Sequence, residues 1–378
     1  MIWKNGAAGL PLTEEALSCI EKEAGELAGL SGAGQPDALP GIEGGTEKDL
    51  GARLVQWAGS GSAPLSEAAC RQLKQGTAVL YGMSRYAMKR VERVLKYADL
   101  ALSMNLEAVR GEIGAFDDRL HSLARPFPGQ IACASNVRRL LEGSEATSDK
   151  GRFGYGYDKA PRVQDAICLR AAPQTHGGSR DMFTFAARQV EQDIACHSET
   201  MDRTELAITG LITGLADLTH ISERRTFRLN ETRLSYGLPM NLVIGDVGIN
   251  HGYPVVQATQ AALVAELKLL TMPAQLVRVG EESVTYFNLC KLLKAVELAE
   301  RVLSVEVLMS GQGMDIVARK VPGLSFGTGT SAAHRCLRQR VAVLEANRFM
   351  VPDMVAALEL LNQGKLLAAA ESAVGTLQ

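Results

Sequence analysis

Residues 206–218 read Leu-Ala-Ile-Thr-Gly-Leu-Ile-Thr-Gly-Leu-Ala-Asp-Leu, and Asp217 is the only charged residue among them. A helix that is apolar on nearly all sides cannot face water, so this one is expected at the centre of a helical bundle. Gly210 and Gly214 are four residues apart and therefore share one helix face, where they let a neighbouring backbone approach closely. The stretch predicts a protein built of helices packed on helices.

A second long helix is predicted downstream, over residues 289–307. Apolar residues recur there at helical spacing and most charges fall off that stripe, the pattern of a helix with one buried face. No segment of comparable strength favours β-strands, and aromatic residues make up only 5% of the chain. The sequence therefore predicts an all-α fold. The apolar stripe consists of Leu289, Leu292, Leu293, Val296, Ala299, Leu303 and Val307.

Two glycine-rich stretches interrupt the helical pattern. Residues 29–51 contain seven glycines and two prolines, and residues 143–162 form a second such stretch that carries Tyr155 and Tyr157. Glycine and proline in this density indicate loops. Both stretches are therefore predicted to be loops between helices.

The remaining periodicity suggests how the chain is organised. Helices are expected over residues 13–30, where Thr13 is placed to cap the first turn, and over residues 66–106. We expect a reduced N-terminal helical domain at residues 1–110 and a helical-bundle domain at residues 111–378.

The charge balance excludes one class of partner. The formal net charge is −2, from 40 basic and 42 acidic residues, whereas a phosphate-binding surface needs an excess of Lys and Arg. Nucleic acid is therefore not expected as a partner. No apolar run reaches the length of a signal peptide or a membrane span, so we expect a cytoplasmic protein without membrane association.

Cysteines and histidines predict neither a disulfide framework nor a metal site. The seven cysteines are scattered, odd in number and without a C-x-x-C pair, which argues against paired disulfides. The six histidines lack spacings such as H-E-x-x-H, so structural or surface roles are favoured. Residues 327–331 are glycine-rich but no lysine follows them, which favours a turn before a helix over a phosphate cradle.

Short motifs along the chain occur in a recognisable order. Residues 163–170 read V-Q-D-A-I-C-L-R, and similar short runs lie at residues 105–111, 115–121, 125–130, 222–225, 237–239 and 262–268. In this order they resemble motifs of the histidine and phenylalanine ammonia-lyases and the related aminomutases, where the first run reads roughly V-Q-D-P-Y-S-L-R. A series in register over about half of the chain carries far more weight than any single motif.

The resemblance implies a fold and a missing cofactor. Family members are all-α, long-helix bundles of the ammonia-lyase (aspartase-like) type, assembled as tetramers whose active sites combine segments of three chains. Their electrophile is a methylidene-imidazolone ring formed from an internal Ala-Ser-Gly, which this sequence lacks. Residues 54–65 resemble a segment well before that tripeptide and residues 96–111 a segment well after it. The resemblance thus implies a deletion within the N-terminal cofactor domain, and we expect no cofactor.

Other catalytic positions also differ from the family pattern. Ile167 stands where the family has the tyrosine of Y-S-L-R, and Trp57 stands where it has the histidine of S-H-A-A-G. An indole is neither a base nor an acceptor. Residues 30–36, which correspond to the family's mobile loop, contain no tyrosine. The proton-transfer groups are therefore expected to be lost.

Three positions keep the residue type of the family, namely Gln164, Arg170 and Glu281. The resemblance implies that Arg170 grips a substrate carboxylate through its planar fork of donors. Substrate-holding chemistry is thus expected to be partly retained.

These features leave three hypotheses open. The first is a non-catalytic subunit that co-assembles with a complete, cofactor-bearing paralogue and lends Arg170, Gln164 or Glu281 to its active site. The second is an enzyme that works without the electrophile on a carboxylate substrate, with Tyr155, Tyr157, Glu281 and Glu282 as candidate acids and bases. The third is a homo-oligomeric protein that binds small acids through Arg170.

Overall fold

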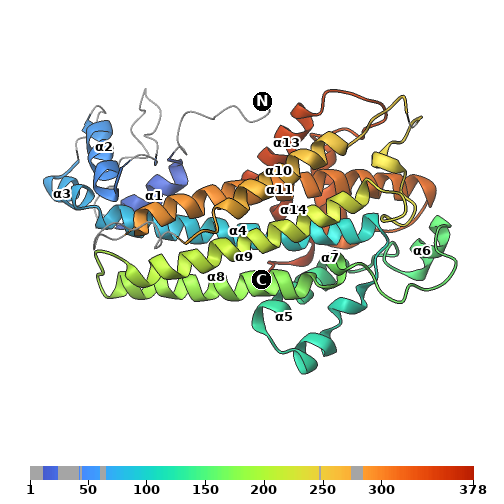
Figure 1. Cartoon of the computed structure of the whole chain (residues 1–378), viewed down its shortest axis with the longest axis horizontal. Coiled ribbons are helices and arrows are strands. Elements are labelled where there is room, and N and C mark those ends of the chain that lie inside the picture. The colour runs from blue at the N-terminus through green and yellow to red at the C-terminus, as the bar shows by residue number, and fades with distance from the viewer. Residues whose placement is uncertain (1–11, 24–41, 43–44, 60–64, 247, 274–283) are drawn as a thin grey trace. The chain divides into compact units, whose positions relative to one another are not determined.

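The fold is known from a computed structural model that describes residues 12–23, 42, 45–59, 65–246, 248–273 and 284–378. Within those residues the regular structure is helical and includes no β-strand, as expected for an all-α chain (Figure 1). The α-helices are α1 (Glu14–Glu23), α2 (Glu47–Gly59), α3 (Glu67–Gln75), α4 (Thr77–Ala108), α5 (Pro128–Leu140), α6 (Asp149–Tyr155), α7 (Ile167–Arg170), α8 (Ala172–Ala195), α9 (Asp202–Leu229), α10 (Pro254–Leu269), α11 (Thr285–Lys320), α12 (Thr328–Arg338), α13 (Val351–Asn362) and α14 (Lys365–Val374). Short helical turns are η1 (Ile113–Phe116), η2 (Leu120–Ala124) and η3 (Met240–Leu242).

The chain forms two compact units, and each combines segments that are distant in sequence. Unit 1 consists of Met1–Glu92, Met182–Thr213 and Leu270–Val296. Unit 2 consists of Arg93–Asp181, Gly214–Leu269 and Glu297–Gln378. The long helices α4, α8, α9 and α11 contribute residues to both units.

In unit 1, a side-chain cap marks the start of α1, and a glycine lets α1 pack closely on α4. Thr13 accepts a hydrogen bond from the Ala16 N–H at 3.2 Å, which confirms its predicted role at the start of α1. Gly82 on α4 lies so close to the Ile20 backbone on α1 that an added Cβ would come within 2.4 Å of the Ile20 Cα. The small residue thus permits α1 to pack directly on α4.

In unit 2, long helices pack at equally close range. A Cβ on Gly177 of α8 would lie 2.7 Å from the Gln130 nitrogen on α5. Gly214 of α9 accepts a hydrogen bond through its carbonyl from the Ser179 hydroxyl on α8 at 2.8 Å. The buried Tyr97 of α4 donates to the Leu361 carbonyl on α13 at 2.6 Å. Helices that are far apart in the sequence, such as α4 and α13, therefore share the core of this unit.

The predicted close approach of a neighbouring backbone is confirmed at Gly214, whereas Gly210 faces a side chain. A Cβ on Gly210 would lie 2.3 Å from the terminal methyl of Met182, and one on Gly214 would lie 3.3 Å from the Ser179 Cα. Burial on all sides is not found, because Leu206 is 67% exposed although Leu211 and Leu215 are fully buried. One face of this apolar helix is therefore open in the single chain.

The apolar stripe of residues 289–307 is confirmed in full. Each of its seven members is buried within α11, with relative exposure of 1% or less. The helical period in the sequence therefore identified the buried face of this helix correctly.

The helical pattern predicted over residues 66–106 is confirmed and is divided into α3 and α4, because Gly76 adopts a left-handed conformation with φ 88° and its N–H donates to the Leu73 carbonyl. Two predicted loops need correction. The expected loop at residues 143–162 contains α6, which ends at Gly156 in the left-handed region. The expected loop at residues 29–51 ends in α2, whose start is fixed by reciprocal hydrogen bonds between Thr46 and Asp49.

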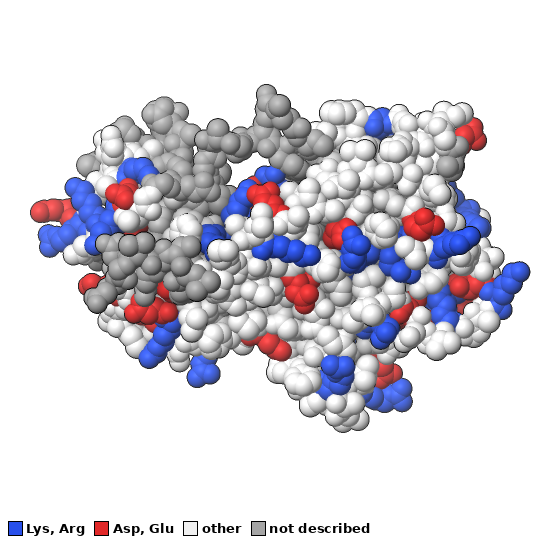
Figure 2. Space-filling view, viewed as in Figure 1, with Lys and Arg blue, Asp and Glu red and all other residues white. Residues whose placement is uncertain are grey.

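Charges are interspersed on the surface, and no single-sign patch dominates the face drawn in Figure 2. Within the part of the chain that the structure describes, no helix is both long enough and apolar enough to span a membrane.

Candidate functional site

The segment of residues 163–170 in unit 2 presents several side chains to solvent. Val163 is 99% exposed and Ile167 is 66% exposed, and Gln164 between them is also exposed. Ile167 begins the single-turn helix α7, which ends at Arg170. The position at which the family resemblance places a catalytic tyrosine is therefore an exposed isoleucine at the start of a helical turn.

Asp165 anchors this segment from within. Its carboxylate is buried and accepts the Glu112 backbone N–H at 2.6 Å. It also pairs with the Arg162 guanidinium at 3.2 Å, and Arg162 in turn pairs with Asp158 at 2.6 Å. Charge-assisted hydrogen bonds of this kind are stronger than neutral ones and fix geometry. The buried Asp165 therefore fixes the backbone that carries the exposed Gln164 and Ile167.

Two arginine–tyrosine stacks accompany the hydrogen bonds of Asp165. The Arg162 guanidinium lies 3.5 Å from the centre of the Tyr236 ring, and the Arg110 guanidinium lies 3.8 Å from that of Tyr155. Arg110 is fully buried and donates to the carbonyls of Ala108, Ser235 and Tyr236. Guanidinium groups that are both stacked on a ring and hydrogen-bonded make a rigid support.

The two tyrosines proposed as alternative acids or bases occupy different environments. Tyr155 is buried, and its hydroxyl donates to the Gly237 carbonyl at 3.1 Å. Burial raises the pKa of its phenol, although the Arg110 guanidinium acts in the opposite direction. Tyr157 is 42% exposed and its ring lies against Gly237. Tyr155 thus has a structural hydrogen bond, whereas Tyr157 faces solvent.

Arg170 is the retained anion-binding candidate. It is half-buried, and its Nε donates to the Asp165 carbonyl at 3.0 Å. Its two terminal nitrogens make no hydrogen bond to any residue that the structure describes. One edge of the guanidinium is thus fixed to the segment while the other donors remain available to a carboxylate.

A buried ion pair lies beneath α7. Arg225 on α9 and Glu306 on α11 are both fully buried and pair through two hydrogen bonds of 2.5 and 2.8 Å. Glu306 also accepts from the Ser222 hydroxyl at 2.6 Å, and Arg225 donates to the Cys168 carbonyl at 3.4 Å. Arg225 therefore links the core to α7. Ser222 and Arg225 belong to one of the family-like motifs, but the motif alone did not reveal this role.

The glycine-rich run at residues 327–331 forms a helix start, as predicted. Gly327 precedes the first residue of α12, and its N–H donates to the buried carboxylate of Glu107 at 2.6 Å. Burial raises the pKa of Glu107 to about 7. The run is therefore capped by an acidic side chain of the protein, which leaves no cradle for a phosphate.

The predicted grouping of Gln164, Arg170 and Glu281 is only partly visible. Gln164 and Arg170 lie on the same segment of unit 2. Glu281 and Glu282 lie outside the described residues. Their part in a site stays a prediction.

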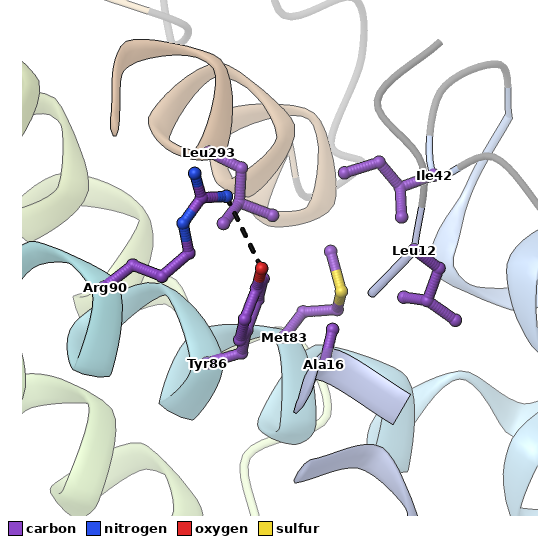
Figure 3. Close-up of a pocket in the computed structure, with 7 residues that line it drawn as sticks. All are labelled: Leu12, Ala16, Ile42, Met83, Tyr86, Arg90 and Leu293. Atoms are coloured by element: carbon purple, nitrogen blue, oxygen red, sulfur yellow. Dashed lines mark hydrogen bonds between the residues drawn. The ribbon is translucent and has the colours of Figure 1, made fainter. Parts of the chain in front are cut away.

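Unit 1 contains a small cavity lined by Leu12, Ala16, Ile42, Met83, Tyr86, Arg90 and Leu293 (Figure 3). Arg90 donates to the Tyr86 hydroxyl at 3.5 Å, and both side chains come from α4. The cavity volume is about 10 Å³, which is the room of roughly one water molecule. It is therefore too small for an amino acid substrate.

The long helices and the anchored segment define an all-helical protein of the ammonia-lyase type. The family model for aromatic amino acid lyases matches residues 52–200 and 201–339. The chain belongs to the aromatic amino acid lyase family.

Two curated relatives show the degree of similarity. The chain is 34% identical over 331 residues to histidine ammonia-lyase 2 of Fusobacterium nucleatum, covering 81% of this chain and 62% of that protein. It is 35% identical over 331 residues to histidine ammonia-lyase of Gloeobacter violaceus, with the same two coverages. The chain thus spans 62% of the length of these relatives.

Solved structures support the same fold. Tyrosine aminomutase from Streptomyces globisporus superposes with a TM-score of 0.80 at 22% identity, covering 100% of this chain and 85% of that one. Histidine ammonia-lyase from Trypanosoma cruzi gives a TM-score of 0.77 at 23% identity, covering 98% and 80%. At these identities the likeness concerns the fold alone.

Proposed function

We propose that this chain is a lyase-family subunit without the methylidene-imidazolone, non-catalytic on its own, that co-assembles with a complete aromatic amino acid lyase or aminomutase paralogue. One observation carries the proposal. The segment of residues 163–170 keeps an anchored Arg170 with available donors, yet exposes Ile167 at the expected tyrosine position. The sequence also contains no Ala-Ser-Gly.

The surface of the long helices supports assembly. Large apolar side chains are exposed on α8, α9, α10 and α11, where a monomer would place them in water. A partner chain that covers Leu206 would bury the exposed side of the apolar run at residues 206–218. The exposed residues are Phe185 (48%), Leu206 (67%), Phe227 (42%), Val255 (60%) and Phe287 (51%).

Arg170 is the residue that this subunit would lend to the shared site. A guanidinium binds a carboxylate through two parallel N–H donors, and such charge-assisted bonds contribute about 1.5–3 kcal/mol each. The hydrogen bond from Arg170 Nε to the Asp165 carbonyl would position the guanidinium and leave its two terminal nitrogens available. Gln164, exposed on the same segment, would supply an amide beside it.

Co-expression with a complete paralogue, followed by native mass spectrometry and assays of the purified complex, tests this function. We expect a mixed oligomer in which Arg170→Ala weakens substrate use but not assembly. Arg71→Ala is the matched control, because Arg71 is an exposed arginine of unit 1. A stable monomer, or a chain that never joins the paralogue, would refute the assembly.

A homo-oligomeric protein that binds small acids is the second candidate, favoured by the same available donors of Arg170. It predicts calorimetric binding of aromatic carboxylates by the chain without any partner. An enzyme that uses Tyr155 as acid or base is less well supported, because that hydroxyl donates to a backbone carbonyl in the interior.

A further inference from the structure

Three metal-binding side chains converge in the core of unit 2. Asp99 comes from α4, Cys133 from α5 and His176 from α8. Each offers one donor atom, and these atoms all lie within 4.8 Å of one another. All three residues are completely buried. The sequence could not indicate this cluster, because its members come from helices far apart in the chain.

The two oxygens of Asp99 have different partners. Its Oδ2 accepts from Arg180 at 2.5 Å and from Asn136 at 2.9 Å. Its Oδ1 faces the His176 Nδ1 at 2.8 Å. The Cys133 sulfur lies within 4.8 Å of the same carboxylate. Arg180 and Asn136 therefore orient the carboxylate from one edge, and the other edge faces the imidazole.

We propose that Asp99, Cys133 and His176 bind a single zinc-type divalent cation, with Arg180 and Asn136 as the outer residues that orient Asp99. A thiolate and an imidazole are the donors that favour zinc over magnesium or calcium, and one carboxylate is compatible with them. The carboxylate and the thiolate, whose proton is released when the ion binds, offset the two positive charges of the ion, and the positive charge of Arg180 remains beside Asp99. Outer hydrogen bonds to a ligating carboxylate are a regular feature of such sites.

The donor atoms would have to move to reach bonding geometry, since they are known to lie within 4.8 Å of one another. Tetrahedral zinc with bond lengths of about 2.0–2.3 Å separates its ligand atoms by about 3.3–3.6 Å. The Nδ1–Oδ1 separation of 2.8 Å would have to widen, by roughly half an ångström on that zinc geometry. Arg180 would keep two further acceptors, the carbonyls of Leu95 at 3.2 Å and Gln378 at 2.7 Å.

Cys133 distinguishes a metal site from a core held by hydrogen bonds alone. Asp99 already accepts from Arg180, Asn136 and His176, so a hydrogen-bonded core would tolerate a small apolar residue in place of the thiol. A metal site would lose its sulfur ligand. Cys133→Ala is therefore the informative variant, and Cys168→Ala, at a half-buried cysteine of the same unit, is its control.

The experiment uses the full chain produced in zinc-supplemented or cadmium-supplemented medium, because the buried site must be filled while the chain folds. After washing with a chelator, we expect metal analysis to find a single equivalent in the wild type and in Cys168→Ala, and its loss in Cys133→Ala. The cadmium form should show thiolate-to-metal absorbance in the ultraviolet that Cys133→Ala lacks.

Wild-type protein that retains no metal would overturn the proposal. Cys133→Ala that retains as much metal and absorbance as the wild type would do the same. If Cys133→Ala fails to fold, the cadmium absorbance of the wild type against Cys168→Ala still decides, since its absence from both refutes a cysteine ligand. None of these outcomes depends on the proposed assembly with a paralogue.

Discussion

The outward and inward faces of residues 163–170 carry opposite kinds of side chain. The inward face has several polar anchors, with Asp165 bonded to Glu112 and Arg162, and Arg225 bonded to Glu306 beneath α7. The outward face carries Val163 and Ile167, both exposed and apolar. The segment is thus firmly anchored, and Ile167 stands where the family resemblance places a tyrosine.

The buried anchors of residues 163–170 bear on the role proposed for this segment. Buried ion pairs and hydrogen-bonded carboxylates are costly to maintain, so a segment without any role would not need so rigid a base. Positioning Arg170 is a role that requires such a base and does not require a tyrosine. The comparison is therefore consistent with the proposed binding or supporting role.

The largest expected effect comes from breaking the buried pair under α7. Glu306→Ala would leave the Arg225 guanidinium buried without its partner, and removing one member of a buried pair costs about 3–5 kcal/mol. The loss of unfolding free energy can be measured by unfolding the protein in urea while hydrogen exchange reports on the residues of unit 2. Glu345→Ala breaks the exposed Arg319–Glu345 pair and should cost less than about 1 kcal/mol. Equal effects of the two substitutions would contradict a special role for the buried pair.

A second buried carboxylate has no cationic partner at hydrogen-bond distance in the described part of unit 2, and it should respond to pH. Burial raises the pKa of Glu107 from 4.5 to about 7. Folded protein then holds the proton more tightly than unfolded protein, so this contribution is fully present below pH 4.5 and is lost as pH rises towards 7. The lost contribution is about 3 kcal/mol.

Glu107→Gln should remove that pH dependence. The difference in unfolding free energy between wild type and Glu107→Gln, measured by urea titration at several pH values, isolates Glu107 from the other titrating groups. A difference that stays constant between pH 4.5 and 7 would show that the carboxyl titrates normally.

Asp165→Ala should have a smaller and more local effect. It removes the acceptor of the Glu112 N–H and one partner of Arg162, and leaving such buried donors unsatisfied costs about 1–3 kcal/mol. Hydrogen exchange of residues 163–170 should accelerate more than that of α11. Uniform acceleration across unit 2 would mean that Asp165 supports the whole unit rather than this segment.

The sequence predicted the parts of this fold that depend on local repetition. The stripe at residues 289–307 and the close backbone approach at Gly214 follow from helical spacing alone, and the structure confirms both. Helix ends were less predictable. Whether Gly76 and Gly156 end a helix depends on a left-handed backbone conformation that many glycines do not adopt.

The candidate site was predictable only in part. Arg170 and Ile167 could be identified by their place in a motif, but the motif could not show which side chains lie beneath them. The pairing of Arg225 with Glu306 joins residues that are 81 positions apart, and no local pattern encodes such a contact. The cluster of Asp99, Cys133 and His176 escaped prediction for the same reason.

The smallest expected effect comes from restoring the missing group on the outward face. Ile167 is 66% exposed, so Ile167→Tyr should change the unfolding free energy by less than about 0.5 kcal/mol. A positioned base typically adds about a hundredfold or more to a rate, but it has nothing to act upon without an electrophile. The sequence lacks the Ala-Ser-Gly from which that electrophile forms.

We therefore expect the pure Ile167→Tyr chain, like the wild type and an Ile167→Val control, to release no cinnamate or urocanate from phenylalanine or histidine. An intact mass without the loss of two waters should accompany this inactivity. Product formation above the protein-free rate would show that the outward face needs only its tyrosine, and the contrast between the two faces would then lie in one residue.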